Sequence, residues 1–182
     1  MIVDTGIDYN HPKLGGGGFP NAKVIGGYDY GGSIDSPAYQ DADPMDVHGH
    51  GTNCAGIAAG DQGTTGDYIG GVAPGSRLYT LKVTHGTGSS AYTSDIVSAW
   101  EWCITHRNDN PAYPIMVIST SLGGDGFSAA CDSYSPSMTE AAADAVSSLT
   151  APAVPAMDPL VFLIAAIALI AIVCIRMRQR KN

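Results

Sequence analysis

Basic side chains are scarce in this sequence, and the few that occur are unevenly placed. Among its 182 residues, 9 Lys and Arg stand against 17 Asp and Glu, which gives a formal net charge of −8 at pH 7. Four of the nine cations follow residue 175, so residues 1–150 are more acidic still. A domain so poor in cations is not expected to bind the phosphates of a nucleic acid.

The sequence also lacks an internal repeat and has only four cysteines. With 182 residues, 45% of them hydrophobic, it is long enough for one domain with a substantial core. Cys54 is expected to be a buried, unreactive thiol in a helix, and Cys174 lies in an apolar tail. Cys103 and Cys131 could form a disulfide if the domain is secreted.

A histidine between two glycines opens a segment of small residues. Residues 48–56 read His-Gly-His-Gly-Thr-Asn-Cys-Ala-Gly. The glycines let the backbone turn sharply, Thr52 can cap free N–H groups, and the alanines that follow suit a tightly packed helix. We therefore expect His50 near the start of a buried helix. A lone histidine in such a place is usually structural, so its role depends on its neighbours.

A carboxylate is expected at the end of the first strand. Met1–Val3 is a short apolar run of the kind that forms a buried strand, and Asp4 follows it directly. Open α/β sheets keep their sites at the carboxyl ends of strands. A carboxylate there can hold an imidazole in one tautomer and stabilise its cation during proton transfer.

The segment Asp-Thr-Gly-Ile-Asp that starts at Asp4 and the histidine segment resemble the first two catalytic blocks of the subtilisin-like serine proteases, the subtilases. Two more blocks follow in that family's order. Gly70–Val83 looks like its central strand, and Ile115–Gly124 looks like the strand that ends in Ser-Leu-Gly-Gly. The resemblance implies a doubly wound parallel α/β sheet over residues 1–149. It also implies peptide-bond hydrolysis, with Asp4 and His50 as two members of a Ser-His-Asp triad.

The same resemblance implies a peptide or protein substrate and two sets of residues that bind it. One set is an edge segment on which the peptide lies as an added strand, and the other lines the primary specificity pocket. These sets are Gly86, Thr87 and Gly88, and Ser121, Leu122 and Gly123. The resemblance places no metal at the site, and the chemistry requires no cofactor.

Two further elements are predicted from local pattern. Val24–Tyr30 is expected to be a second strand. Thr93 or Ser94 is expected to cap a helix that continues to about Arg107 and returns the chain to the sheet, which gives a parallel β-α-β unit. The predicted core face of that helix consists of Ile96, Val97, Trp100 and Ile104.

Two blocks that a subtilase needs are missing, the Gly-Thr-Ser-Met segment of the nucleophile and the oxyanion asparagine. The resemblance ends near Val146, so we expect a C-terminally truncated domain that is inactive as an isolated chain. Ser137-Met138 superficially resembles the nucleophile motif. However, Ser137 and Glu140 are spaced as in a capping box, so Ser137 is expected to cap a helix. The alternative function is that of a membrane-anchored, non-catalytic peptide-binding module, a pseudoprotease.

Four aspartates, at positions 35, 41, 43 and 46, lie in one acidic loop. Subtilase loops often bind a structural calcium ion, so such a site is possible here. The spacing is not that of a defined calcium motif, and a solvated surface loop is the favoured interpretation.

The end of the sequence differs from the rest. Residues 150–159 are a Pro/Ala linker, residues 160–175 are uncharged and almost wholly apolar, and residues 176–182 are rich in arginine. A helix over the apolar run would be about 24 Å long, a minimal transmembrane span. The cations after it predict a cytoplasmic C-terminus and a domain outside the cell, at its surface. The tail also resembles the three-part sorting signals of envelope proteins.

Overall fold

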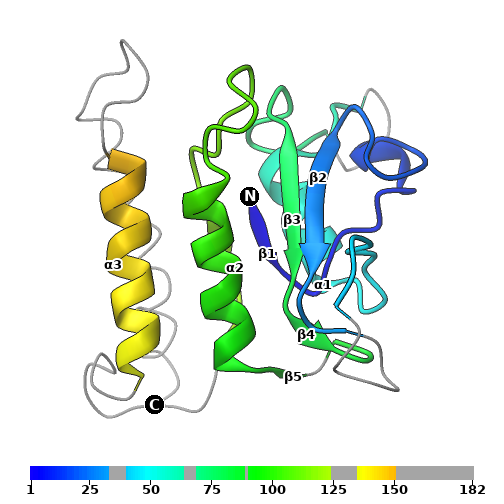
Figure 1. Ribbon diagram of the computed structural model, residues 1–182. Coiled ribbons are helices and arrows are strands. Elements are labelled where there is room, and N and C mark those ends of the chain that lie inside the picture. Colours follow the sequence, from blue (N-terminus) through cyan, green and yellow to red (C-terminus); the bar gives the residue numbers. More distant parts are fainter. Residues whose placement is uncertain (33–39, 64–68, 89, 124–134, 151–182) are drawn as a thin grey trace, which may run out of the picture.

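A parallel sheet of four short strands forms the centre of the molecule (Figure 1). The computed structural model describes residues 1–32, 40–63, 69–88, 90–123 and 135–150. The strands lie in the order β2-β3-β1-β6, and each neighbouring pair is parallel. Their bounds are Ile2–Asp4 for β1, Val24–Asp29 for β2, Leu78–Lys82 for β3 and Ser119–Thr120 for β6. A hairpin of β4 (Thr84–His85) and β5 (Ser90–Ala91) follows β3.

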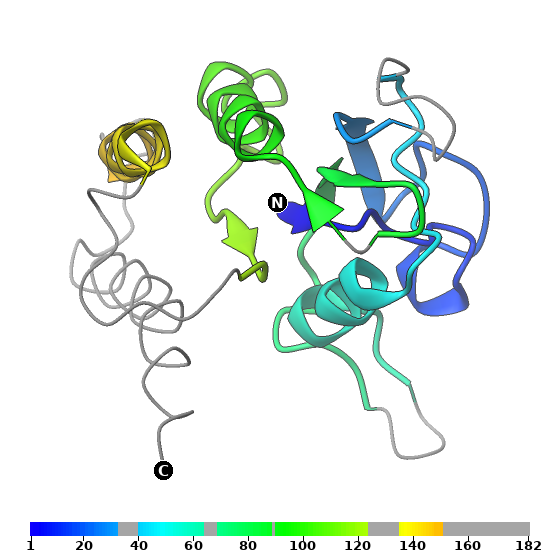
Figure 2. The ribbon, with the colours of Figure 1, turned by 90° about the horizontal axis from the view of Figure 1, so that it is seen from below.

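Helices cover both faces of this sheet, as Figure 2 shows in the view along the strands. Helix α1 (His50–Ala59) lies on one face, and α2 (Thr93–Thr105) lies on the other. Helix α3 (Pro136–Thr150) packs against α2, and a 3₁₀ turn, η1, spans Pro12–Leu14. The parallel α/β sheet with helices on both sides confirms the predicted fold class for the described part of the chain.

The two faces of the sheet bury separate clusters of apolar side chains. Ile2 belongs to the cluster under α1 and Val3 to the cluster under α2, because successive side chains of a strand point to opposite faces. Val3 and Leu81 are completely buried. Burial of each such side chain contributes about 1.5–3 kcal/mol, which is why these short strands are stable where they lie.

Helix α2 begins where the sequence predicts, but its cap and core face differ. Tyr92 is its N-cap and provides no side-chain hydrogen bond, so neither Thr93 nor Ser94 caps it. Its fully buried side chains are Ile96, Ala99 and Cys103, whereas Val97, Trp100 and Ile104 are only partly buried. The prediction followed the larger apolar residues, but the face toward the sheet has room for small ones.

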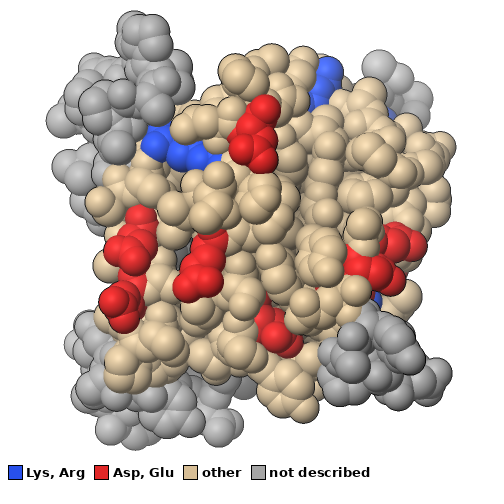
Figure 3. All heavy atoms as spheres, in the orientation of Figure 1, with Lys and Arg blue, Asp and Glu red and all other residues tan. Residues whose placement is uncertain are grey.

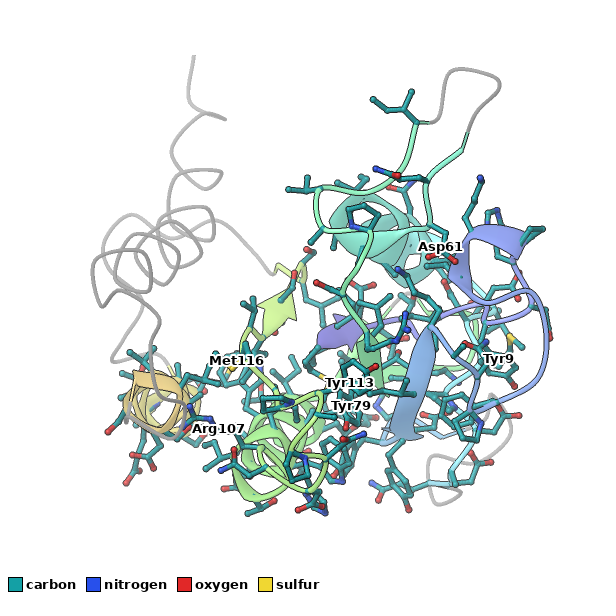
Figure 4. The ribbon with its side chains drawn as sticks, turned by 90° about the horizontal axis from the view of Figure 1, so that it is seen from above. Tyr9, Asp61, Tyr79, Arg107, Tyr113 and Met116 are labelled. Atoms are coloured by element: carbon teal, nitrogen blue, oxygen red, sulfur yellow. The ribbon has the colours of Figure 1, made fainter. Side chains whose placement is uncertain are left out.

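Helix α3 begins one residue before Ser137, at Pro136, so Ser137 lies inside the first turn and the predicted capping box is wrong. Proline at a first helical position is favourable because its missing N–H is not needed there. At the other end, Arg107 donates hydrogen bonds to the carbonyls of Ser148 and Leu149. Figure 4 shows Arg107 reaching from the end of α2 to α3.

Two further predictions differ from the structure, and one end of the disulfide that the sequence left open lies within the described residues. Strand β6 is only two residues long, although a strand was expected from Ile115 onward, and Ile115 itself is buried in the core. Helix α1 is not wholly buried, since Ile57 is 60% exposed. Cys103 carries a free thiol that is buried among the core residues, and its expected partner Cys131 lies outside the described residues.

The C-terminal predictions also fall outside the described residues. Helix α3 continues to Thr150, the residue at which the linker was expected to begin, and residues 151–182 are not described. Within residues 1–32, 40–63, 69–88, 90–123 and 135–150, no helix is long and apolar enough to span a membrane. The predicted transmembrane segment at 160–175 lies outside these residues.

Candidate active site

The two catalytic residues expected from the sequence lie in direct contact. Asp4 ends β1 and His50 begins α1, and a distance of 2.7 Å joins His50 Nδ1 to Asp4 Oδ1. The Asp4 carboxylate is 1% exposed, whereas the His50 side chain is 44% exposed. Because a carboxylate accepts, Nδ1 carries the proton and Nε2 keeps a lone pair. The pair is therefore arranged for Nε2 to act as a general base.

A close approach of backbone segments brings the pair together. Gly51 follows His50, and a Cβ atom there would lie 2.2 Å from the carbonyl oxygen of Gly6 and 3.1 Å from Asp4 Cβ. Only glycine leaves room for α1 to begin this close to the end of β1. Gly49, the N-cap of α1, has a φ of 97°, in the left-handed region that favours glycine. The sequence predicted sharp turns at both glycines. The structure confirms the turn at Gly49, whereas Gly51 is helical and lies in the first turn of α1.

Asp46 holds the N-terminus of α1 in place, a role that the sequence did not reveal. Its Oδ1 accepts hydrogen bonds from the backbone amides of His48 and Gly49 and from the Thr5 hydroxyl, at 2.8–2.9 Å. Its Oδ2 accepts from the backbone amide and the hydroxyl of Thr52. Thr52 therefore donates to Asp46 instead of capping the helix itself. The sequence placed Asp46 in a solvated acidic loop, but it is 9% exposed.

These hydrogen bonds determine the ionisation of Asp46. Burial by itself raises the pKa of this carboxyl, but the hydrogen bonds from Thr52, Gly49 and His48 outweigh it. The pKa of Asp46 is consequently below its ordinary value of 3.8. Asp46 is therefore a carboxylate at neutral pH, and the positive end of α1 stabilises its charge.

The first predicted substrate-binding set lies next to His48, at the end of the sheet where the strands have their carboxyl ends and the catalytic pair lies. Gly86, Thr87 and Gly88 connect β4 to β5 as a turn, with φ values of 55° at Gly86 and 90° at Gly88. The amide of Gly88 donates to the carbonyl of His85, and a Cβ on Gly88 would lie 2.5 Å from His48 Cβ. These residues thus form a tight turn, where the sequence suggested an extended edge.

The second predicted set follows β6, the strand beside β1. Leu122 packs against the core, whereas Ser121 and Gly123 are exposed. A Cβ on Gly123 would meet no atom of the described residues within 4 Å. Because β1, β3 and β6 are parallel, both predicted sets follow the same edge of the sheet as Asp4.

Comparison with known proteins agrees with this geometry. The sequence profile of the Subtilase family matches residues 1–166. The chain belongs to the subtilase family. It is 41% identical over 125 residues to the serine protease AprX of Bacillus subtilis (strain 168), which covers 68% of this chain and 25% of that protein. It is 40% identical over 124 residues to thermitase of Thermoactinomyces vulgaris, which covers 68% of this chain and 36% of thermitase.

A solved structure is also similar to this subtilase chain, that of a cold adapted subtilisin-like serine proteinase. It is 27% identical in sequence, with a TM-score of 0.47, over 79% of this chain and 41% of the other. The chain thus spans about a quarter to two fifths of the length of these relatives. The family assignment rests on the sequence profile.

Ser137, the serine weighed as a substitute nucleophile for this subtilase, lies on another part of the fold. It is exposed in the first turn of α3, which packs on α2. Helix α2 covers one face of the sheet, and α1, which carries His50, covers the other (Figure 2). The fold therefore gives Ser137 no position beside the catalytic pair.

The acidic loop of this subtilase does not assemble a calcium site among the described residues. Asp46 is fully engaged with α1, Asp41 and Asp43 are exposed, and Asp35 lies outside the described residues. Asp43 accepts a hydrogen bond from the Tyr9 hydroxyl, and burial and then this bond raise the pKa of Tyr9 to about 12. The described part of the loop gives no set of converging oxygen ligands that would fit Ca²⁺.

Cations are few among the described residues, and some of them pair with carboxylates. On the face seen in Figure 3, Asp and Glu side chains are scattered over several elements, and Lys and Arg show at only a few places. Two of the few cations in the domain are also engaged in ion pairs. Lys23 pairs with Asp61 at 2.9 Å, and Lys82 pairs with Asp29 at 2.6 Å.

Proposed function

We propose that this chain is the N-terminal part of the catalytic domain of a subtilisin-like serine endopeptidase. The observation that carries the proposal is the contact of 2.7 Å between His50 Nδ1 and the buried Asp4 at the end of β1. In peptide-bond hydrolysis, His50 Nε2 would take the proton of a serine hydroxyl as that serine attacks the peptide carbonyl. Asp4 would hold the ring in the required tautomer and stabilise the imidazolium.

The chain as it stands is proposed to be inactive, because the nucleophile and oxyanion blocks are missing from its sequence. Substrate would be a peptide or protein bound between the turn at Gly86–Gly88 and the segment Ser121–Gly123. Both sets follow the carboxyl ends of strands, at the end of the sheet where the catalytic pair lies. No cofactor takes part in this chemistry.

A fluorophosphonate probe tests the proposal, because it labels a serine only when a histidine has activated it. We expect no covalent labelling of the purified chain, measured by intact-protein mass spectrometry, under conditions that label subtilisin fully. Labelling at Ser137 would contradict both the proposed inactivity and the position of that residue on α3.

Peptide-binding measurements test the alternative that the chain is a non-catalytic peptide-binding module. A side chain at position 123 would meet no atom of the described residues within 4 Å, so Gly123→Leu is expected to block a peptide there without disturbing the described core. Peptide binding to the chain and its variants is measured by fluorescence anisotropy. Binding that persists in His50→Ala but is lost in Gly123→Leu would favour the pseudoprotease. Absence of peptide binding in all three proteins would count against it.

We also propose that residues 160–175 anchor the domain at the cell surface, with the C-terminus in the cytoplasm. The support is the uncharged run itself and the cations that follow it. The full chain is expected to remain in the membrane fraction after alkaline extraction, and a chain that lacks residues 160–182 is expected to be released. Release of the full chain would contradict the anchor.

A further inference from the structure

Three side chains that can each bind a metal ion meet at the carboxyl end of β1. They are Asp4, His50 and Cys54, and their ligand atoms all lie within 4.8 Å of one another. His50 and Cys54 are four residues apart on α1, so they share one face of that helix. The distance from Cys54 Sγ to His50 Nδ1 is 3.9 Å. Among the described residues, no other group of three or more His, Cys, Asp or Glu is placed in this way.

Asp4 has one carboxylate oxygen that receives no hydrogen bond by distance and angle from the described residues, and the Cys54 thiol lies close to this carboxylate. Its Oδ1 accepts from His50 Nδ1 and from the backbone amide of Thr5, both at 2.7 Å. Its Oδ2 is buried and has no hydrogen-bond partner among the described residues. The residue as a whole is only 1% exposed. A buried carboxylate oxygen without a partner is costly, and a cation is one ligand that would compensate it.

We propose that Asp4, His50 and Cys54 form a binding site for a borderline-soft divalent cation such as Zn²⁺. One carboxylate oxygen, one imidazole nitrogen and one thiolate are ligands that Zn²⁺ accepts together, whereas Ca²⁺ takes oxygen ligands. Tetrahedral Zn²⁺ at its usual bond lengths separates its ligand atoms by roughly 3.3–3.8 Å. His50 Nδ1 lies 3.9 Å from Cys54 Sγ, close to that range, and 2.7 Å from Asp4 Oδ1, so the imidazole and the carboxylate must move apart by about 0.6 Å to admit the ion. Three protein ligands leave the fourth position open to water.

The ion would exclude the catalytic arrangement of the same residues. Zn²⁺ binds the lone pair of His50 Nδ1, so the Nδ1 proton that now faces Asp4 must leave that atom. The imidazole stays neutral by carrying its proton on Nε2, and the thiol of Cys54 releases one proton to solvent. Nε2 then has no lone pair to accept a proton. Metal binding itself does not depend on the proposed peptidase activity.

Cobalt binding to the full chain tests this site, because Co²⁺ replaces Zn²⁺ in such sites and a thiolate ligand gives it a charge-transfer absorption band. We expect one Co²⁺ per chain with that band, and displacement of the Co²⁺ by Zn²⁺. Cys54→Ala is expected to remove the band and to weaken Zn²⁺ binding more than about tenfold, measured by calorimetry. Asp4→Ala is expected to weaken binding by a similar factor.

The other cysteines supply matched controls. Cys103→Ala, Cys131→Ser and Cys174→Ser are each expected to keep both the band and the Zn²⁺ affinity. Cys54 is half-buried on α1, and a circular dichroism spectrum like that of the parent would confirm that Cys54→Ala still folds. Cobalt binding without a thiolate band, or Zn²⁺ binding that Cys54→Ala leaves unchanged, would overturn the proposal.

Discussion

Replacement of Lys82 by Met is expected to lower the free energy of unfolding by about 4 kcal/mol. Lys82 and Asp29 are register partners on β3 and β2, and a distance of 2.6 Å joins Lys82 Nζ to Asp29 Oδ2. Their side chains are only 8% and 6% exposed. Met keeps the length and the apolar stem of Lys but leaves the Asp29 carboxylate buried without its cation. Removal of one partner of a buried ion pair typically costs about 3–5 kcal/mol.

The double variant Lys82→Met/Asp29→Asn distinguishes two contributions to the lost stability: the loss of the ion pair itself and the cost of a buried Asp29 carboxylate without its cation. The amide oxygen of the introduced asparagine would still accept the hydrogen bonds that Asp29 now accepts from the amides of Gly31 and Gly32. It carries no charge, so we expect the double variant to regain more than half of the lost stability in urea denaturation. Lys13→Met, whose ammonium donates to one exposed carbonyl, is the control and should cost less than about 1 kcal/mol. Equal losses in the single and double variants would contradict this account.

Removal of the Asp46 carboxylate is expected to cost about 3 kcal/mol in unfolding free energy. Asp46→Ala would leave the amides of His48, Gly49 and Thr52 without their acceptor at the N-terminus of α1. Hydrogen bonds to a charged group contribute about 1.5–3 kcal/mol each, and water replaces part of what is lost. Asp43→Ala is the matched control, because Asp43 lies in the same loop but is exposed and accepts one bond from Tyr9.

The pH dependence of this effect follows from the lowered pKa of Asp46. A carboxyl whose pKa is lower in the folded than in the unfolded state stabilises the folded state. Its contribution is complete at pH values above its pKa in the unfolded state, here about 3.8. That contribution is lost as the pH falls through the folded pKa. The stability difference between the parent and Asp46→Ala should therefore be constant near neutral pH and should narrow below pH 3.8. A difference that grows as the pH falls would contradict the assignment.

The parts of the fold that depend on local pattern could be predicted from the sequence. The apolar run before Asp4 forms β1, and the glycines around His50 place that residue at the start of α1. Val24–Asp29 is a strand as predicted, ending one residue early. The resemblance of these two segments to the first two catalytic blocks of the subtilases implied that Asp4 and His50 meet. The distance of 2.7 Å between them agrees with that expectation.

The parts that depend on long-range packing could not be predicted. Asp46 has a local signal, an aspartate three residues before Gly49, which is typical of a side chain that accepts backbone N–H groups in a turn. That signal alone does not distinguish such a turn from a solvated acidic loop, because acceptance of the Thr5 hydroxyl depends on a residue 41 positions away. The pairing of Lys82 with Asp29 likewise depends on strand register, which the sequence alone does not specify.

The most direct test of the catalytic pair is the ¹⁵N NMR spectrum of the His50 imidazole in the neutral form. The geometry predicts that Nδ1 carries the proton and that this proton resonates far downfield because it is hydrogen-bonded to Asp4. His50→Gln would assign the signal by removing it, and Asp4→Ala should abolish the downfield shift while the other histidines keep theirs. A neutral His50 protonated on Nε2, with a spectrum that Asp4→Ala leaves unchanged, would contradict the account.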